Sequence, residues 1–376
     1  MESGLGGRCG AAEGSVRWVI RRRRLILATA PSPALMHYRR VYLESFGYTL
    51  PEEVVTTDEL ERRLAPAYQR LRLPEGRLEL MTGIRERRFY PPGTRPGEIS
   101  IESGRRAIAA AGIDPALIGA LVHGSVCRDY LEPATACGVH HALGLPAECL
   151  IYDVSNACLG ILSGMVQVAN MIELGQIRAG LIVGTEDGRS LVETTVERLN
   201  SDVSIDRRGV KPFIASLTIG SGSVGVVLCD EALSRERHRL LGGAVVANTE
   251  GHGLCQSEGL ETFMRTDSEQ LMLNGVETGR RTFEPFLNEV GWSRGDIDKT
   301  ICHQVGVAHR KLLFETLGLD ESLDYSTFET LGNTGAAALP LTMALAAEAG
   351  RFAKRDRVAM LGIGSGINCQ MLGVEW

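Results

Sequence analysis

A cysteine at position 158 lies between two apolar segments of the chain. Residues 150–154 are typical of a buried strand, and the residues after Cys158 place apolar side chains almost all round a helix, which predicts a buried helix. A sulfur in the first turn of such a helix meets unpaired backbone N–H groups and the helix dipole, which both favour a thiolate. We interpret Cys158 as a nucleophile, with a buried structural cysteine as the alternative.

Two further side chains have the chemistry to act on a carbonyl group. His303 ends a short apolar strand, where open α/β sheets usually place functional groups, and it could serve as a base or a hydrogen-bond donor. Asn333 lies in a loop between two glycines, so its amide could point into a cavity. The alternatives are a histidine satisfied within the core and ordinary turn chemistry. The other histidines that we considered are interpreted as structural: His123, His140, His141 and His309.

Two more segments could contribute to a site. The glycine-rich turn at residues 362–366 contains Ser365, and its small residues could expose backbone N–H groups to an oxyanion. A plain hairpin turn is the alternative. Glu132 directly precedes Pro133 at the start of a helical segment, which is typical of a capping residue, although a carboxylate there could also accept a proton.

Alternating strands and helices must position these residues. The alternation predicts an α/β protein with largely parallel sheets covered by helices, and a similar order of elements after residue 235 indicates an internal duplication. Strands are predicted within residues 40–46, 120–126, 150–154, 179–185, 217–230, 241–248, 300–304, 357–362 and 369–374. Helices are predicted within residues 57–64, 98–111, 191–200, 271–290, 308–318 and 336–349.

Composition excludes several classes of protein. The chain has 376 residues, 44% hydrophobic and 23% charged, which is ordinary for a globular protein of two halves. A net charge of −6 argues against a nucleic-acid partner. The 9 cysteines form no CxxC pair, so we expect neither a disulfide framework nor a metal site, and a reducing cytoplasm fits best. No apolar run approaches the roughly 20 residues of a membrane span.

The first 35 residues differ from the rest of the chain. Residues 21–24 are four arginines, and the apolar run at residues 25–28 that follows is too short for a secretory signal. We expect residues 1–35 to be a disordered extension, or to result from an upstream start codon with Met36 as the natural first residue.

The motifs together resemble a known family. The segments NACLG around Cys158, HQ at His303, LGNTG around Asn333 and the late GIGSGIN have the order and spacing of thiolase-fold condensing enzymes of the ketoacyl-synthase III type. The resemblance runs from about Arg40 to Trp376. Within that family the segments VCRDYLEPATA and DVSNACLG and the final tryptophan are most similar to the OleA branch, which condenses two long acyl-CoA chains head to head.

The resemblance implies a fold and a role for each residue. The fold is a thiolase fold, in which duplicated βαβαβαββ halves form a five-layer αβαβα arrangement, here with halves at residues 36–235 and 236–376. By resemblance Cys158 carries the acyl group, and the backbone N–H of Ser365 helps to bind the oxyanion. His303 and Asn333 hold the second thioester carbonyl, and Glu132 reaches the active site of the neighbouring subunit of a homodimer.

The sequence also departs from the ketoacyl-synthase III pattern. Gly306 and Val307 occupy the region where that family usually has an asparagine after the HQ pair. Arg77 and Met81 replace residues that help to hold CoA, so the CoA-binding residues stay unassigned.

The resemblance predicts a non-decarboxylative Claisen condensation of two long-chain acyl-CoA molecules. The product would be a β-keto acid for olefin biosynthesis, with downstream enzymes of that pathway as further partners. Acyl-CoA is the substrate, and no cofactor is expected. The alternatives are a decarboxylating 3-oxoacyl-ACP synthase III, an acyl-CoA transferase or hydrolase, and a scaffold without catalytic activity.

Overall fold

The computed structural model describes residues 34–258 and 263–376. Within these residues a continuous path of paired strands runs in the order β12-β13-β14-β9-β2-β8-β7-β5-β6, and β1 (Ala34–His37) pairs with β9 beside it. The bounds of the strands on the path are β2 (Val41–Thr49), β5 (Ile118–Gly124), β6 (Leu150–Val154), β7 (Ala179–Glu186), β8 (Gly222–Asp230), β9 (His238–Ala247), β12 (Lys299–Cys302), β13 (Arg357–Gly364) and β14 (Asn368–Glu375).

The strands form a mixed sheet, so the prediction of largely parallel sheets is wrong. Strands β5, β6 and β7 are parallel, as are β12 and β13. The pairs β7–β8, β2–β8, β9–β14 and β13–β14 are antiparallel. The reason is clearest at β13 and β14, because a short turn can join only antiparallel neighbours, whereas parallel neighbours need a long crossover.

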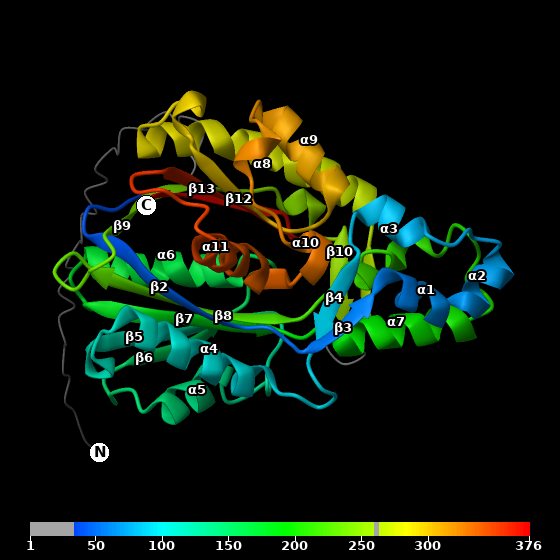
Figure 1. The fold of residues 1–376 in the computed structure, drawn as a ribbon, viewed down its shortest axis with the longest axis horizontal. Coiled ribbons are helices and arrows are strands. Elements are labelled where there is room, and N and C mark those ends of the chain that lie inside the picture. The colour runs from blue at the N-terminus through cyan, green and yellow to red at the C-terminus, as the bar shows by residue number, and fades with distance from the viewer. Residues whose placement is uncertain (1–33, 259–262) are drawn as a thin grey trace, which may run out of the picture. The chain divides into compact units, whose positions relative to one another are not determined.

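Helices and strands alternate in five layers, as the resemblance implied. Figure 1 places α8 (Ser268–Val290) and α9 (Val307–Leu317) on one outer face, and α4 (Pro96–Ala111) and α5 (Thr135–Leu143) on the opposite one. Between the two groups of strands lie α6 (Gly160–Glu173) and α11 (Ala338–Glu348). The two groups are joined where β2 meets β9, through Tyr42 opposite Arg239 and Leu43 opposite His238.

The helix α6 is buried, as its apolar pattern predicted. Ile161, Leu162, Met165 and Val168 are fully buried in the central core, together with apolar residues of α11 and of strands from both groups. Each such side chain contributes roughly 1.5–3 kcal/mol through burial. This packing fixes the start of α6, and with it the segment that carries Cys158.

A second group of elements surrounds a separate core. Most of its members are short, and the sequence pattern predicted only α1 and α7. The group comprises α1 (Thr57–Arg63), α2 (Ala65–Leu71), α3 (Arg77–Thr82), α7 (Arg189–Ser201) and the pairs β3 (Glu53–Thr56)–β4 (Glu86–Phe89) and β10 (Cys255–Glu258)–β11 (Phe263–Thr266). The short helix α10 (Phe328–Leu331) packs beside β4, and its Leu331 belongs to the central core. Single 3-10 turns lie at Pro115–Leu117, Lys211–Phe213, Ser216–Thr218, Thr249–Gly251, Arg294–Asp296, Glu321–Leu323 and Gly335–Ala337.

The strand β6 is an edge strand, and the prediction that it is buried is wrong. It ends the path of strands, paired on one side to β5 only. Leu150 is 51% exposed and Ile151 is 36% exposed. An apolar run cannot by itself distinguish a central strand from an edge strand that another molecule covers.

The predicted bounds of the two halves lie at residues 36 and 235, close to the start of β1 and between two strands. Residues 1–33 of the predicted extension lie outside the described residues, and β1 begins at Ala34, before the predicted start at residue 36. Residue 235 falls in the connection between β8 and β9, and the division there stays a prediction.

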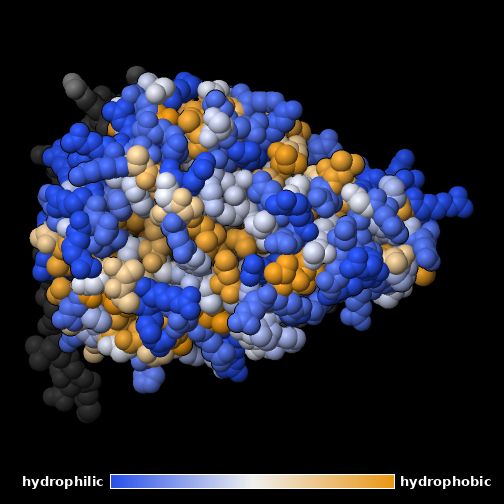
Figure 2. Space-filling view, viewed as in Figure 1, coloured by the Kyte–Doolittle hydropathy of each residue, from blue (hydrophilic) through white to orange (hydrophobic). Residues whose placement is uncertain are grey.

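On the face drawn in Figure 2, hydrophilic residues predominate and hydrophobic ones gather in several separate groups. Among the described residues, no helix has the length and apolarity needed to cross a membrane.

Candidate active site

Cys158 lies in a short segment fixed by side-chain amides. The sequence analysis placed Cys158 in the first turn of the helix, and this position is wrong. Because α6 begins at Gly160, the cysteine lies just before the first turn. Asn156 Nδ2 donates a hydrogen bond to Ser163 Oγ at 2.9 Å, and Asn368 Nδ2 donates to Asn156 Oδ1 at 3.0 Å. The segment is therefore bonded both to α6 and to the start of β14.

Two glycines let the start of α6 lie directly against β5. A Cβ atom on Gly124 would lie only 2.6 Å from the carbonyl carbon of Gly160, so no larger residue fits there without moving the backbone. The helix start is therefore held at one depth relative to the sheet. This close contact determines where the residues just before Gly160, including Cys158, enter the site.

Burial of the Cys158 sulfur opposes the thiolate that a position beside a helix start favours. The residue is half-buried, and loss of solvent raises the pKa of its thiol to about 12, with a smaller rise from the negative charge of Glu186. The backbone N–H groups of Ser365 and of Cys158 itself face the sulfur and lower the pKa, but by less. Burial outweighs the local dipoles, so a proton must leave the sulfur during the reaction.

We expect the alkylation of Cys158 by iodoacetamide to accelerate with pH and to show no plateau below about pH 10. The thiolate is the reactive form, and for a thiol whose pKa is raised to about 12 the thiolate fraction grows about tenfold per pH unit in that range. Peptide-resolved mass spectrometry separates Cys158 from the half-buried Cys137, which serves as an internal control. A rate that levels off near pH 7 would contradict the neutral thiol.

His303 directly follows β12 and is buried. Its backbone N–H donates to the Leu361 carbonyl oxygen at 3.1 Å, which keeps the residue beside β13. Burial, with a smaller contribution from the nearby His309, lowers the pKa of the imidazole to about 3. The ring is therefore neutral at physiological pH, which suits a hydrogen-bond donor to an oxygen atom better than a pre-protonated acid.

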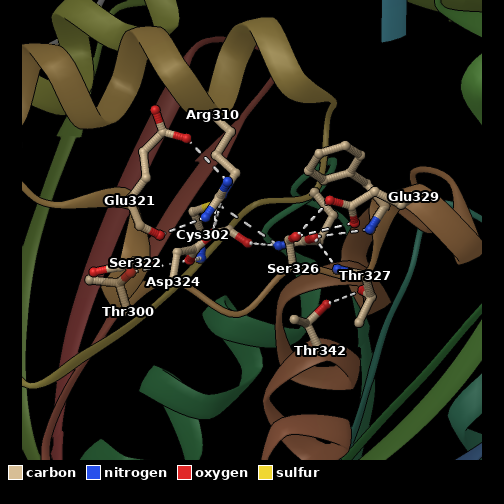
Figure 3. A network of polar contacts seen from close by, with 12 residues as sticks. Thr300, Cys302, Arg310, Glu321, Ser322, Asp324, Ser326, Thr327, Glu329 and Thr342 are labelled. Atoms are coloured by element: carbon tan, nitrogen blue, oxygen red, sulfur yellow. Dashed lines mark hydrogen bonds and ion pairs between the residues drawn. The ribbon is translucent and has the colours of Figure 1, made fainter. Parts of the chain in front are cut away.

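A buried polar network supports the strand end that carries His303 (Figure 3). The Asp324 carboxylate accepts hydrogen bonds from the Cys302 backbone N–H at 3.2 Å and from Arg310 Nε at 2.8 Å. Gln304, the second residue of the HQ pair, donates to the Cys302 carbonyl oxygen at 2.7 Å and accepts from the Thr327 backbone N–H at 2.8 Å. The glutamine thus joins the His303 strand to the segment that leads to Asn333.

Replacing Asp324 by Ala should lower the free energy of unfolding by about 3–5 kcal/mol, because it leaves Arg310 and the Cys302 N–H without their buried partner. Urea denaturation measures the change. Glu321→Ala is the matched control, since that carboxylate also binds Arg310 at 3.1 Å but its side chain is 42% exposed. The control should change stability by about 1 kcal/mol or less. Equal effects of the two substitutions would contradict the structural role of Asp324.

Asn333 is held by backbone bonds on both sides. Its N–H donates to the Thr218 carbonyl oxygen at 2.9 Å, and its carbonyl oxygen accepts from the Gly220 N–H at 3.0 Å. In the side chain, Oδ1 accepts from the Gly335 N–H at 3.0 Å. Since the amide oxygen is engaged, the group that the side chain can offer to a ligand is the Nδ2 donor.

Glu186 is a site residue that the sequence analysis missed. It ends β7 and is buried, and burial raises the pKa of its carboxyl group. Its Oε1 accepts hydrogen bonds from the Val126 N–H at 3.0 Å and from the Ala336 N–H at 3.3 Å. A carboxylate directly after the apolar residues 179–185 is the signal that could have identified it.

Glu132 is exposed in the connection between β5 and α5, and within the described chain no hydrogen bond or ion pair holds its carboxylate. The structure thus brings Cys158 and Ser365 together, and links the Asn333 loop to them through Glu186. It places His303 at the neighbouring strand end. It leaves Glu132 outside this group. Over the described ranges, no set of three or more His, Cys, Asp and Glu side chains is arranged to hold a metal ion.

Comparisons with known proteins agree with this fold. Residues 287–376 match the model of the 3-oxoacyl-[acyl-carrier-protein (ACP)] synthase III C terminal, and residues 81–214 match the thiolase N-terminal domain. The chain is 44% identical over 352 residues to an acyl-CoA:acyl-CoA alkyltransferase of Shewanella oneidensis, covering 91% of this chain and 100% of that protein. It is 33% identical to an acyl-CoA:acyl-CoA alkyltransferase of Xanthomonas campestris pv. campestris, covering 91% of this chain and 100% of the relative.

A solved structure extends the comparison to three dimensions. A variant of Xanthomonas campestris OleA with bound lauric acid and lauroyl-CoA superimposes with a TM-score of 0.87 at 32% identity, covering 90% of this chain and 100% of the other. Fold and site therefore define an acyltransferase with the thiolase fold. Within that class the chain belongs to the acyl-CoA:acyl-CoA alkyltransferase family, whose structural relatives include OleA.

Proposed function

We propose that the protein joins two long-chain acyl-CoA molecules in a non-decarboxylative Claisen condensation through an acyl-Cys158 intermediate. The product is a β-keto acid that supplies long-chain olefin biosynthesis. The observation that carries the proposal is the Cys158 sulfur facing the Ser365 backbone N–H at the end of β13. The lauroyl-CoA bound to a relative of the same fold supports acyl-CoA as the substrate class.

In the first half of the reaction, the Cys158 sulfur attacks the thioester carbon of one acyl-CoA. A new C–S bond forms to the protein, the bond to CoA sulfur breaks, and the proton of the thiol leaves with CoA. The oxyanion that forms on the way accepts hydrogen bonds from the backbone N–H groups of Cys158 and Ser365, which already face the sulfur. Losing one such donor typically costs roughly 3–4 kcal/mol of barrier.

In the second half, another acyl-CoA binds with its carbonyl oxygen between His303 and Asn333. His303 is neutral and Asn333 has Nδ2 to offer, so both donate hydrogen bonds to the enolate oxygen without giving up a proton. Glu132 of the partner subunit takes the α-proton. The enolate carbon attacks the acyl-Cys158 carbonyl and expels the thiolate, and water then hydrolyses the remaining CoA thioester.

A homodimer supplies the missing base in this proposal. The open edge of β6 carries the exposed Leu150 and Ile151, and the connection after β5 carries Tyr130 at 49% and Leu131 at 91% exposure. A strand edge flanked by exposed apolar side chains is a surface that a second strand can cover. Pairing two copies there would place the Glu132 segment of each at the other copy.

Incubation of the pure protein with myristoyl-CoA alone tests the proposal. The expected product is a β-keto acid, which loses CO2 to give a long-chain ketone that mass spectrometry detects, with release of both CoA molecules. Free myristic acid without ketone would mean a hydrolase. Condensation that requires malonyl-ACP and releases its CO2 would mean a decarboxylating 3-oxoacyl-ACP synthase III, the class of the matched C-terminal model.

A further inference from the structure

One oxygen atom of Glu186 connects two segments that are far apart in the sequence. Oε1 accepts the Val126 N–H at 3.0 Å from the segment after β5, and the Ala336 N–H at 3.3 Å from the turn after Asn333. Gly335 packs directly on the same carboxyl group, because a Cβ atom there would lie 3.0 Å from the Glu186 Cδ. The carboxyl group is therefore the common support of both segments.

Each of these segments carries a residue of the proposed condensation step. The turn that holds Ala336 and Gly335 also fixes the Asn333 side chain, since Gly335 N–H donates to Asn333 Oδ1 at 3.0 Å. The segment that begins at Val126 continues to Glu132, the proposed base for the partner's site. A shift of the Glu186 acceptor oxygen would therefore move both Asn333 and the start of the segment that carries Glu132.

Burial makes this carboxylate costly. Glu186 is 5% exposed, and within the described residues no lysine, arginine or histidine forms an ion pair with it. A buried carboxylate without a cationic partner normally destabilises a fold. An apolar residue would fill the same space at lower cost, but it could not accept the two backbone N–H groups.

We propose that Glu186 is a positioning residue for the condensation step. Glu186 positions the Asn333 amide in its own subunit, and it positions the start of the segment that carries Glu132 to the partner subunit. The inference rests on the proposed function. The acceptor oxygen carries this role, and the role does not extend to the acylation of Cys158.

Three variants test this inference: Glu186→Ala, Glu186→Gln and Glu44→Gln. Glu186→Ala removes the acceptor, whereas Glu186→Gln keeps an amide oxygen in its place. Glu44→Gln is the matched control, because Glu44 is also buried and accepts a backbone N–H, from Arg235 at 3.0 Å, but lies in β2 outside the site. For each dimer, three quantities are measured with myristoyl-CoA: the burst of CoA from Cys158 acylation, the yield of ketone, and deuterium uptake at the α-carbon.

Glu186→Ala should lose about 100-fold in ketone formation, since a misplacement of about 1 Å at a reacting group costs that much. Its CoA burst should stay at least as fast as in the wild type, because removing a nearby negative charge lowers the pKa of the Cys158 thiol. Deuterium uptake should fall with ketone formation. Glu186→Gln should recover most of the lost ketone, and Glu44→Gln should match the wild type in all three quantities.

Equal losses of the burst and of the ketone in Glu186→Ala would overturn the inference, since they indicate a general structural role. A wild-type ketone yield in Glu186→Ala would overturn it as well, and so would a failure of Glu186→Gln to recover activity. These outcomes require a wild-type enzyme that forms ketone. If the wild type forms none, the proposed function fails and the inference falls with it.

Discussion

Cys158→Ala should abolish both the CoA burst and ketone formation, with a loss on the order of 10⁶-fold in turnover, as is typical when a covalent nucleophile is removed. The backbone N–H groups of Cys158 and Ser365 face the sulfur that the substitution removes. The fold should survive, because the substitution removes one half-buried sulfur and leaves the contact of Gly160 with Gly124 unchanged. A thiol reagent that detects free CoA measures the first step directly, and Cys158→Ala should release none.

Cys137→Ala is the matched control for this experiment. Cys137 is also half-buried, but it lies in α5 on an outer face of the fold. It should leave the burst and the ketone yield at wild-type values. A second check is intact-protein mass spectrometry after addition of myristoyl-CoA, in which the wild type gains one acyl group and Cys158→Ala gains none. Unchanged turnover in Cys158→Ala would reject the acyl-cysteine route.

The long, strongly patterned elements could be predicted from the sequence. The helix at residues 98–111 is present as α4, and Gly112 ends it in the left-handed conformation, at φ +57°, that glycine adopts without strain. The buried helix after Cys158 is present as α6. The short helices α2 and α3 were not predicted, because neither begins with a side-chain cap, whereas the equally short α1 is capped by Thr56, whose side chain accepts from the Glu59 N–H. Packing around the second core decides the structure of α2 and α3.

Electrostatic properties of the site were harder to predict than the positions of its residues. The sequence placed Cys158 beside a helix start, from which a thiolate followed, but the helix begins at Gly160 and desolvation raises the pKa of the thiol. The net effect depends on how much water the tertiary packing removes, which no local pattern records. Glu186 was missed for a similar reason, since its two acceptor contacts join segments separated by most of the chain.

The function assigned to Glu132 depends on a second subunit, which a single chain does not contain. It is exposed here, and the family resemblance assigns its function to a neighbouring subunit. The same holds for the edge strand β6, which was wrongly predicted to be buried. A partner subunit that covers Leu150 and Ile151 would bury these exposed apolar side chains. Assembly therefore accounts for both differences if the proposed dimer forms.

Glu132→Ala should leave the CoA burst intact and reduce ketone formation and deuterium uptake by about 10²–10⁴-fold, the usual contribution of a positioned general base. The reason is that acylation of Cys158 needs no carbanion, whereas the condensation in the proposed function has no decarboxylation to generate one. Glu98→Ala is the control, since Glu98 is also exposed but lies in α4. Full condensation by Glu132→Ala would remove its role as the base.

Co-expression of Glu132→Ala with Cys158→Ala decides whether the glutamate acts across the subunit boundary. In a mixed dimer, the site that keeps Cys158 belongs to the Glu132→Ala chain and receives Glu132 from the Cys158→Ala chain, so it is complete. Random pairing in a twofold dimer makes half of the dimers mixed with one complete site each, so ketone formation should return to about a quarter of the wild-type rate. If Glu132 instead serves the cysteine of its own chain, every site in the mixture lacks one of the two groups, and no activity should return.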